Sequence, residues 1–359
     1  MRTKLLVAFV AVAALAGCGG DDDAETTTQK APAVATDLTP VKDYLLDHTS
    51  RLQGDTAKLA TQADAYYKLA KSENFDYEKL LQTHRSEVTD QVKAMQDTYI
   101  DANPAYEEME GVVAGVPTLA DYDVIIDAGS DKSDPENAVP FTVKTPTGRT
   151  FEQPGNFFQL IETSLWGTDP KYAAKGVTPD LDGDGKVGFG EAVPDADFLV
   201  AAAKDFATNA KDLDAAAKQW QPTTQDAFTA LVVMTPTMSE YFEAWKNSRF
   251  VAGNDAKETV FVAASRLQDI AGILNGLVLI YDSVEPSVTK ANADQAKQTG
   301  SDLKGLHQFA VKLRDQEARG KTFSPSDADT LGSDAQDRAE AIAGQVSQAA
   351  GQLGIKLEN

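Results

Sequence analysis

Apolar residues recur at spacings of three and four through most of the chain, and this helical period constrains the fold more than any other feature of the sequence. Thr39 and Pro40 begin the first periodic stretch, with Thr39 as a cap and Pro40 at the first helical position. A second stretch runs from about Asp76 to Asn103, and Ser324 and Pro325 begin the last. Strand signals are scarce, so we predict an all-α protein of two packed antiparallel helix bundles. The clearest apolar stripes comprise Leu45, Leu52, Leu59, Ala63 and Tyr66, then Phe206, Ala210, Leu213, Ala217 and Trp220, and then Leu267, Ile270, Leu274, Leu277 and Tyr281.

The N-terminal residues have the pattern of a bacterial lipoprotein signal. Arg2 and Lys4 precede a short apolar run over residues 5–15. Residues 15–18 read Leu-Ala-Gly-Cys, which resembles the lipobox, where signal peptidase cleaves before the cysteine. Cys18 is the single cysteine of the chain, which argues against a plain secretory signal that contains a cysteine by chance. We therefore predict a lipoprotein signal peptide over residues 1–17 and a lipid on Cys18. That lipid would anchor the protein outside the cytoplasm, on the bacterial cell membrane.

Charge and composition limit the remaining possibilities. The 55 Asp and Glu residues outnumber the 33 Lys and Arg, for a net charge of −22. A surface this acidic repels phosphate backbones, so nucleic acid is excluded as an expected partner. Residues 18–38 contain almost no large apolar side chains and are predicted to be a flexible, acylated tether. The helical domain then covers residues 39–359, with bundle one at about 39–167, an insertion at 168–194, and bundle two at about 195–356.

The inserted segment contains a twelve-residue pattern typical of an EF-hand calcium loop. Aspartates stand at the first, third and fifth positions, glycine at the sixth, an apolar residue at the eighth and glutamate at the twelfth. An isolated acidic turn would match two or three of these positions by chance, but not all of them in register. Because Pro179 precedes the loop and no amphipathic helix flanks it, the loop is EF-hand-like, with a structural role. The predicted calcium ligands are Asp180, Asp182, Asp184, Lys186 through its carbonyl, and Glu191.

Three further segments place carboxylates beside large apolar residues at helical spacing. Such pairs project to one face of a helix, and facing helices in bundles build metal sites from them. Acidic pairs are common in so acidic a chain and most are solvated, so spacing alone favours an exposed surface. The candidate metal ligands are Glu107, Glu110, Asp123, Asp127, Gln159 and Glu162.

Taken together, these segments resemble the imelysin family, and within it the EfeO/EfeM-type iron-uptake lipoproteins. The run Tyr106–Glu110 resembles the family's Y-E-x-x-E, and Leu119–Asp127 resembles its L-D-x-x-x-D. Ile161–Gly167 resembles the I-E-x-x-L-W-G end of its G-x-H-x-x-E motif. The resemblance covers about residues 39–356. It implies an imelysin-like fold and an extracytoplasmic protein that binds iron or another divalent or trivalent metal. Its partner would be an iron permease or a peroxidase of the same uptake system.

One residue departs from that pattern, because Gln159 stands where the family has histidine. An amide oxygen in place of an imidazole nitrogen leaves an oxygen-rich set of ligands, which suits ferric iron, manganese, magnesium or calcium. The sequence has no H-E-x-x-H or other catalytic motif, so we predict a binding protein rather than an enzyme. Two alternatives stay open: a metallopeptidase of the imelysin type, and a calcium-stabilised structural or adhesion lipoprotein.

Overall fold

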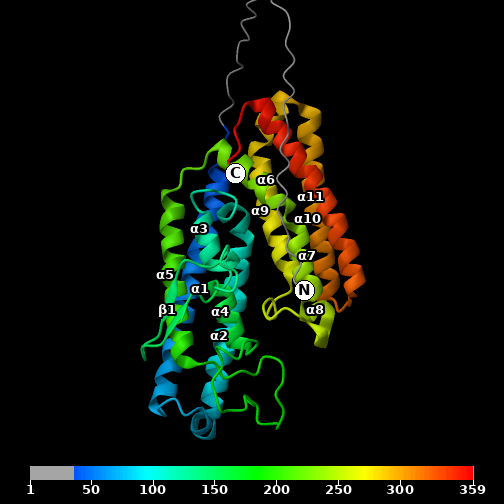
Figure 1. Cartoon of the computed structure of the whole chain (residues 1–359). Helices are drawn as coiled ribbons and strands as arrows, with labels where there is room; N and C mark the ends of the chain where they lie inside the picture. The colour runs from blue at the N-terminus through cyan, green and yellow to red at the C-terminus, as the bar shows by residue number, and fades with distance from the viewer. Residues whose placement is uncertain (1–35, 359) are drawn as a thin grey trace, which may run out of the picture. The chain divides into compact units, whose positions relative to one another are not determined.

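The computed structural model describes residues 36–358, and nearly all of its regular structure is helical (Figure 1). The prediction of an all-α protein is confirmed. The signal peptide over residues 1–17 and Cys18 lie outside the described residues, as does most of the predicted tether. The elements are α1 (Thr39–Ser72), α2 (Tyr77–Val113), α3 (Ala120–Asp123), the π-helix η1 (Val124–Ala128), β1 (Thr142–Lys144), β2 (Thr150–Glu152), α4 (Phe157–Trp166), α5 (Ala196–Gln219), α6 (Thr224–Met234), the 3₁₀-helix η2 (Thr235–Thr237), α7 (Met238–Asn247), α8 (Arg249–Ala252), the 3₁₀-helix η3 (Gly253–Asp255), α9 (Arg266–Ala291), α10 (Ala293–Ala318) and α11 (Pro325–Leu353).

The first bundle comprises α1, α2, α4 and α5, with α1 packed along both α2 and α5 (Figure 1). Its predicted apolar stripe is buried, from Leu45 to Tyr66. The predicted division at about residue 195 was wrong, because α5 packs against α1 and α4. The chain leaves the first bundle through the irregular insertion at 168–194 and returns to it in α5. The first bundle therefore extends to Gln219.

The second bundle comprises α6, α7, α9, α10 and α11 (Figure 1). In the part of the chain that the structure describes, α9 is the one helix long and apolar enough to cross a membrane. Its apolar residues, such as Ile270 and Leu277, are instead buried against α2 and α10. The long apolar run of α9 is thus the core of the second bundle, as the sequence predicted.

The start of α1 differs from the prediction in two ways. Thr39 is the first helical residue rather than the cap, and Leu38 occupies the cap position without a side-chain hydrogen bond. Leu38 is also buried in the core, and the Thr36 hydroxyl lies 3.0 Å from that of Ser287. Residues 36–38 therefore belong to the folded domain and not to the tether. Burial of the apolar Leu38 side chain away from water stabilises this position of the chain.

α2 continues ten residues beyond the predicted end at Asn103, through Pro104. A proline inside a helix removes one hydrogen bond and costs about 3 kcal/mol. The turns that follow bury Tyr106, Met109 and Val112, and this apolar burial outweighs the cost. The extension matters for function, since it carries the first pair of candidate ligands.

The two bundles are joined where α2 packs against α9. Gly276 of α9 allows this close approach, because a Cβ at this position would stand 2.7 Å from the Glu108 carbonyl oxygen of α2. The pairing sets Glu107 of α2 beside Arg266 in the first turn of α9. Side chains from both bundles therefore meet at this junction.

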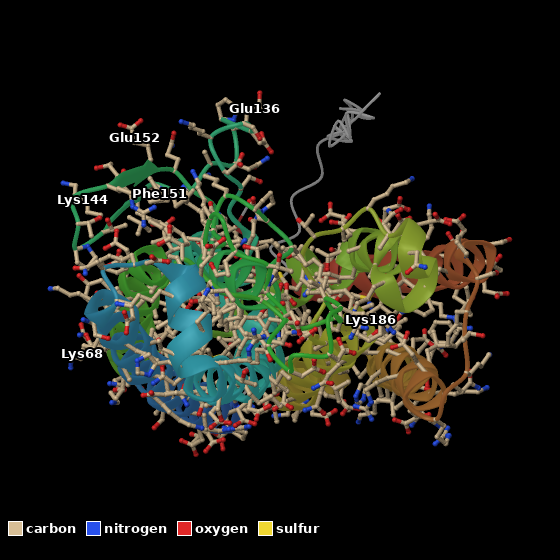
Figure 2. All side chains as sticks on the ribbon, turned by 90° about the horizontal axis from the view of Figure 1, so that it is seen from below. Lys68, Glu136, Lys144, Phe151, Glu152 and Lys186 are labelled. Atoms are coloured by element: carbon tan, nitrogen blue, oxygen red, sulfur yellow. The ribbon has the colours of Figure 1, made fainter. Side chains whose placement is uncertain are left out.

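Two irregular regions are attached to the first bundle. β1 and β2 form a short antiparallel hairpin in which Val143 pairs with Phe151. The insertion is pinned at its ends by a bridge between Ala173 and Pro194. Figure 2 shows the hairpin, with Lys144 and Phe151 labelled, at one edge of the view from below, and Lys186 of the acidic loop away from it.

Candidate metal centre

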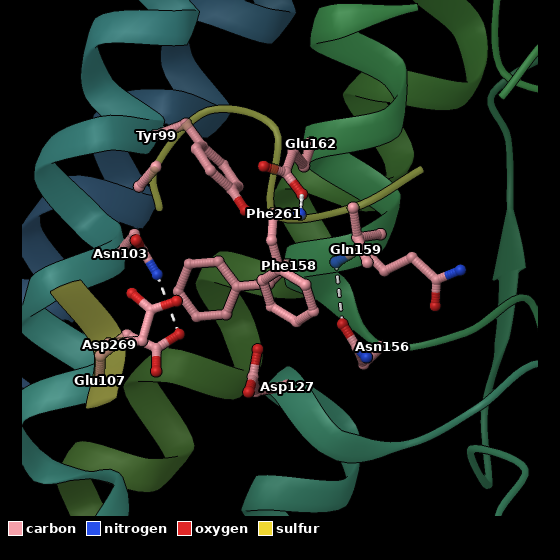
Figure 3. A pocket seen from close by; sticks show the side chains of 12 residues that line it. Tyr99, Asn103, Glu107, Asp127, Asn156, Phe158, Gln159, Glu162, Phe261 and Asp269 are labelled. Carbon is pink, nitrogen blue, oxygen red and sulfur yellow. Dashed lines mark hydrogen bonds between the residues drawn. The ribbon is translucent and has the colours of Figure 1, made fainter. Parts of the chain in front are cut away.

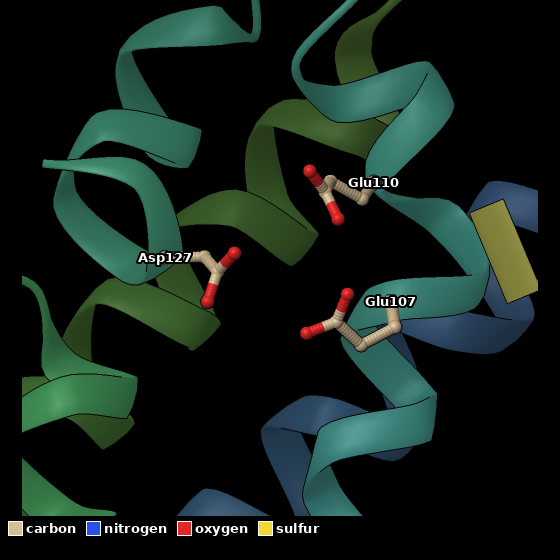
Figure 4. A group of neighbouring side chains, drawn as sticks. All are labelled: Glu107, Glu110 and Asp127. Atoms are coloured by element: carbon tan, nitrogen blue, oxygen red, sulfur yellow. The ribbon is translucent and has the colours of Figure 1, made fainter. Parts of the chain in front are cut away.

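Three of the predicted ligands converge at the junction of the bundles. Glu107 and Glu110 project from the same face of α2, and Asp127 projects toward them from η1 (Figure 4). One carboxylate oxygen from each lies within 4.8 Å of the others. Glu107 and Glu110 are buried, 2% and 4% exposed. Oxygens from two separate elements at this spacing can coordinate a single cation.

The π-helical turn places Asp127. Residues 124–128 carry i+5 hydrogen bonding, with Gly129 N donating to the Val124 carbonyl. Such a turn rotates the side chains that follow it relative to α3, and π turns are frequent at functional sites. Asp123, the fourth predicted ligand, instead accepts a 2.6 Å hydrogen bond from the Tyr106 hydroxyl. It is buried beside the three converging carboxylates and is not one of them.

Neighbouring side chains hold the cluster in position. Asn103 Nδ2 donates to Glu107 at 2.9 Å, and the Tyr241 hydroxyl donates to Glu110 at 2.7 Å. Arg266 Nη1 lies 3.3 Å from each oxygen of Glu107 and 3.1 Å from Asp269. Glu110 Oε2 and Asp269 Oδ1 are buried without a hydrogen-bond partner among the described residues. Each of these oxygens can accept a further bond.

Sequence reasoning missed Arg266 and Asp269. Both are buried in the first turn of α9, 5% and 1% exposed. The available signal was a charged pair three residues apart at the start of a helix whose other residues are strongly apolar. A buried charge needs a partner of opposite sign, so this pair indicated a charged site at that end of α9.

Burial and mutual repulsion keep these carboxyls protonated to an unusually high pH. Burial raises the pKa of Glu110 to about 7, and the charge of Asp127 adds to the shift. Burial likewise raises the pKa of Asp269 to about 6. The same cause holds the pKa of Glu107 and that of Asp123 well above the usual range. A cation among these groups would favour their ionised forms and displace protons.

A small cavity of about 50 Å³ opens beside the cluster. Glu107, Asp127 and Asp269 reach it from one side, and Tyr99 and Phe158 form apolar walls (Figure 3). This volume holds a cation with one or two water molecules. The site is thus small and acidic, and it suits a small ligand.

Gln159 lines the rim of this cavity, but its amide does not face the carboxylates. Figure 3 shows the side chain leading away from Glu107 and Asp127. Its Oε1 lies over Gly155, where an added Cβ would stand only 2.7 Å away. Gln159 is therefore a rim residue and not a ligand in this arrangement, because its backbone amide is bonded to the Asn156 cap and its side chain extends outward.

Glu162 is also in a different position from the predicted one. Its carboxylate accepts hydrogen bonds from three successive backbone amides, Phe261 at 2.7 Å and Val262 and Ala263 at 2.9 Å. Burial raises its pKa to about 7, against these amides, which lower it. Both oxygens are engaged by the backbone, so Glu162 lines the cavity without joining the three converging carboxylates.

The acidic loop brings its three aspartates together. Ligand oxygens of Asp180, Asp182 and Asp184 lie within 4.8 Å of one another. Asp180 accepts hydrogen bonds from the amides of Gly183 and Gly185. Gly185 has φ +86°, as the sharp turn of such a loop requires. No helix flanks residues 180–191 in the described structure, so a helix–loop–helix hand is not formed.

Glu191 and Lys186 are the other two predicted calcium ligands of this loop. The Glu191 carboxylate accepts from the amides of Leu181 at 2.7 Å and Asp182 at 3.0 Å. It therefore closes the loop but does not belong to the group of three aspartates. The Lys186 amide donates to Asp184 at 2.7 Å. The backbone amide of Gly188, followed by those of Asp182 and Leu181, lowers the pKa of Glu191.

Among the described residues, no histidine belongs to either acidic group. His48 bonds to Glu108 and to the Tyr44 carbonyl, and His84 lies near Glu73. The donors of the two groups are therefore carboxylate oxygens, and either group could bind a metal ion. Oxygen donors suit hard cations better than zinc or copper.

Comparison with curated protein sequences found no match. A scan against protein families matched one, Imelysin (Peptidase_M75), over residues 43–348. The match spans both bundles and both acidic groups, and the helical fold agrees with it. The chain belongs to the imelysin family.

Proposed function

We propose that this protein is an extracytoplasmic, lipid-anchored metal-binding protein of the EfeO/EfeM type, and that it assists iron uptake. One observation carries the proposal: Glu107, Glu110 and Asp127 converge beside a small cavity that Glu107 and Asp127 line, and an oxygen of Glu110 has no partner among the described residues. Carboxylates brought this close repel each other unless a cation lies between them. The Arg266 guanidinium contacts Glu107 and Asp269, and among the described residues it forms no hydrogen bond or ion pair with Glu110 or Asp127.

The donor set indicates the class of metal. Counting Asp123 and Asp269, four buried carboxyls and the half-buried Asp127 share the influence of one guanidinium, that of Arg266. An oxygen-only site with excess negative charge favours a small, highly charged, hard cation. Ferric iron meets this description. Manganese is a divalent ion that also suits carboxylate ligands. The metal is then cargo, which an iron permease or a peroxidase of the same system would receive or supply.

The acidic loop supports a separate structural role for calcium. Asp180, Asp182 and Asp184 form a compact group in which Asp182 and Asp184 are exposed and Asp180 is half-buried. Arg85 of α2 contacts the Asp180 carbonyl, and Thr89 donates to the Leu181 carbonyl at 3.0 Å. Calcium at this loop would hold the insertion against α2, and extracellular calcium is abundant enough for sites of modest affinity.

A peptidase requires more than this site supplies. Catalytic zinc sites in proteins use histidine or cysteine ligands and keep one position open for water. Among the described residues the converging ligands are carboxylates, and the cavity is enclosed by the side chains of Tyr99 and Phe158. We therefore propose binding rather than peptide cleavage, although the family is named after a peptidase.

Metal analysis combined with one double variant tests the proposal. Purified protein would be stripped with a chelator, then titrated with manganese and ferric iron by calorimetry and assayed for bound metal. Glu110→Gln with Asp127→Asn should lose this binding by at least about tenfold, as the loss of charged ligands predicts. Glu108→Gln is the matched control, since Glu108 follows Glu107 in α2 but pairs with His48. Equal affinity in the double variant and the wild type would refute the site. Peptide cleavage that chelation abolishes would favour the peptidase.

A further inference from the structure

One wall of the carboxylate cavity is not helical. Residues 256–265, which we name the strap, connect η3 to α9 without regular structure. Val260, Phe261 and Ala264 of the strap line the cavity. The other lining residues come from α2, η1, α9 and from α4 with its cap residue (Figure 3). A passage through the helical walls would separate packed helices, whereas movement of the strap would withdraw only Val262 and the adjacent Ala263 from the core.

The strap is fixed by polar contacts at several places, beginning with the amides of Lys257 and Glu258, which donate to the Asn247 carbonyl. Glu162 of α4 accepts from the amides of residues 261, 262 and 263. The Val262 carbonyl accepts from Arg249 Nε at 2.6 Å, and the Thr259 carbonyl accepts from the Thr168 hydroxyl at 2.6 Å. Among these contacts the Glu162 carboxylate is the buried one and the one with three bonds. Bonds to a charged acceptor are the strongest of their kind.

Phe261 is held in an unfavourable backbone conformation at the centre of the strap. Its φ is +55°, in the left-handed region that bulky residues rarely adopt. Its ring covers the Arg266 guanidinium, whose carbon lies 4.1 Å from the ring centroid. Strain of this kind persists only where surrounding contacts enforce it, and it concentrates at ligand clamps and switches. The Glu162 carboxylate supplies that enforcement, because it bonds to the amide of Phe261 itself.

We propose that the strap is a lid over the carboxylate cavity, that Glu162 is the latch that keeps it shut, and that Phe261 is the plug that metal must pass. The inference rests on the proposed metal-binding function and concerns access to the same cavity. Glu162 then acts as a positioning residue through the strap and is not a metal ligand. Release of its three bonds would free residues 261–263 and relieve the backbone of Phe261.

Two variants separate the latch from the plug. Glu162→Gln keeps the size of the side chain and removes the charged acceptor. Phe261→Gly removes the ring and suits the left-handed backbone, so the path of the strap is retained. Glu258→Gln is the control, since it lies on the strap and its side chain makes no hydrogen bond to the amides of residues 261–263. Stopped-flow measurements with manganese would give association and dissociation rates, and hydrogen exchange would report on the strap amides.

A lid predicts faster rates in both directions with little change at equilibrium. We expect Glu162→Gln to raise both the association and the dissociation rate by about tenfold or more, because it loses the charge-assisted bonds to the strap. We expect Phe261→Gly to raise both rates to a similar extent, because it removes the ring that lines the cavity. The dissociation constant should stay within about twofold. In Glu162→Gln the amides of residues 261–263 should exchange faster, even in metal-free protein. The control should match the wild type in every measurement.

The possible failures are distinguishable. If wild-type protein does not bind manganese or iron, the proposed function fails, while hydrogen exchange still tests the latch. If the wild type binds metal and both variants bind and release it at wild-type rates, the lid is refuted. If Glu162→Gln weakens equilibrium binding without changing the association rate, Glu162 is a ligand and the latch is refuted.

Discussion

The affinity of the buried site for metal should rise steeply with pH, because binding must displace protons from Glu107 and Glu110. Burial raises the pKa of Glu110 from 4.5 to about 7. Below that value each displaced proton weakens binding tenfold per pH unit. Between about pH 7 and pH 5, Glu110 alone should weaken manganese binding about fiftyfold, or about 2.3 kcal/mol. The pKa of Glu107 is also well above its usual range, so it makes the dependence steeper.

The stability of the metal-free protein should change in the opposite direction. A carboxyl whose pKa is higher in the folded than in the unfolded state stabilises the fold most below its ordinary value. For Glu110 this stabilisation is lost as pH rises from about 4.5 through about 7. Metal binding should therefore raise the melting temperature most at the upper end of this range.

Calorimetry in buffers of different ionisation enthalpy would measure both the affinity and the number of protons released. Glu110→Gln should reduce the proton count by about one and flatten the pH dependence by the same amount. Glu108→Gln should leave both unchanged, because Glu108 is outside the cluster and its pKa is lowered by His48. Binding that is independent of pH, with no protons released, would contradict the convergence of carboxyls at this site.

Three further changes have defined outcomes. Asp180→Asn with Glu191→Gln should abolish the rise in melting temperature caused by calcium, which linkage sets at about 2.7 kcal/mol at a hundredfold excess over the dissociation constant; a surviving rise would remove calcium from the loop. Cys18→Ser should release the protein from the membrane fraction, as detergent partitioning would show, and unchanged partitioning would contradict the lipid anchor. Arg266→Met should cost about 3–5 kcal/mol in urea unfolding at neutral pH, since it leaves Glu107 and Asp269 without their cation. This loss of unfolding free energy should be smaller with bound manganese or in mild acid. Equal stability of the variant and the wild type at neutral pH would show that the guanidinium is dispensable.

Local pattern was sufficient to predict the helices, but not the site. The spacing of Glu107 and Glu110 by itself favoured an exposed pair, and the family resemblance grouped them as ligands; the structure buries both in α2. Asp127 was predicted from its apolar surroundings and the family resemblance. Its direction depends on the π turn, which no residue pattern indicated. Pro104 even suggested that the helix ends before this pair.

The remaining parts of the site depend on contacts that side-chain type does not encode. Glu162 bonds to backbone amides, and Val262 is 100 residues away from it in sequence. Any residue other than proline supplies such a donor, so the partner could not be read from the sequence. Arg266 pairs with Glu107 only because α9 returns beside α2. The direction of Gln159 likewise follows from the path of the chain at Gly155.

α2 belongs to both bundles, and this has a consequence for how the molecule unfolds and how it can evolve. One face of α2 is covered by α1, and another is covered by α9. Removal of the second bundle would expose the face that holds Glu107 and would leave it without Arg266. Neither half can therefore keep the cavity by itself, and heating should melt both bundles in one cooperative transition. A recombination event that exchanged one bundle between relatives would have to preserve the α2–α9 seam, so the two bundles are expected to be inherited as a pair.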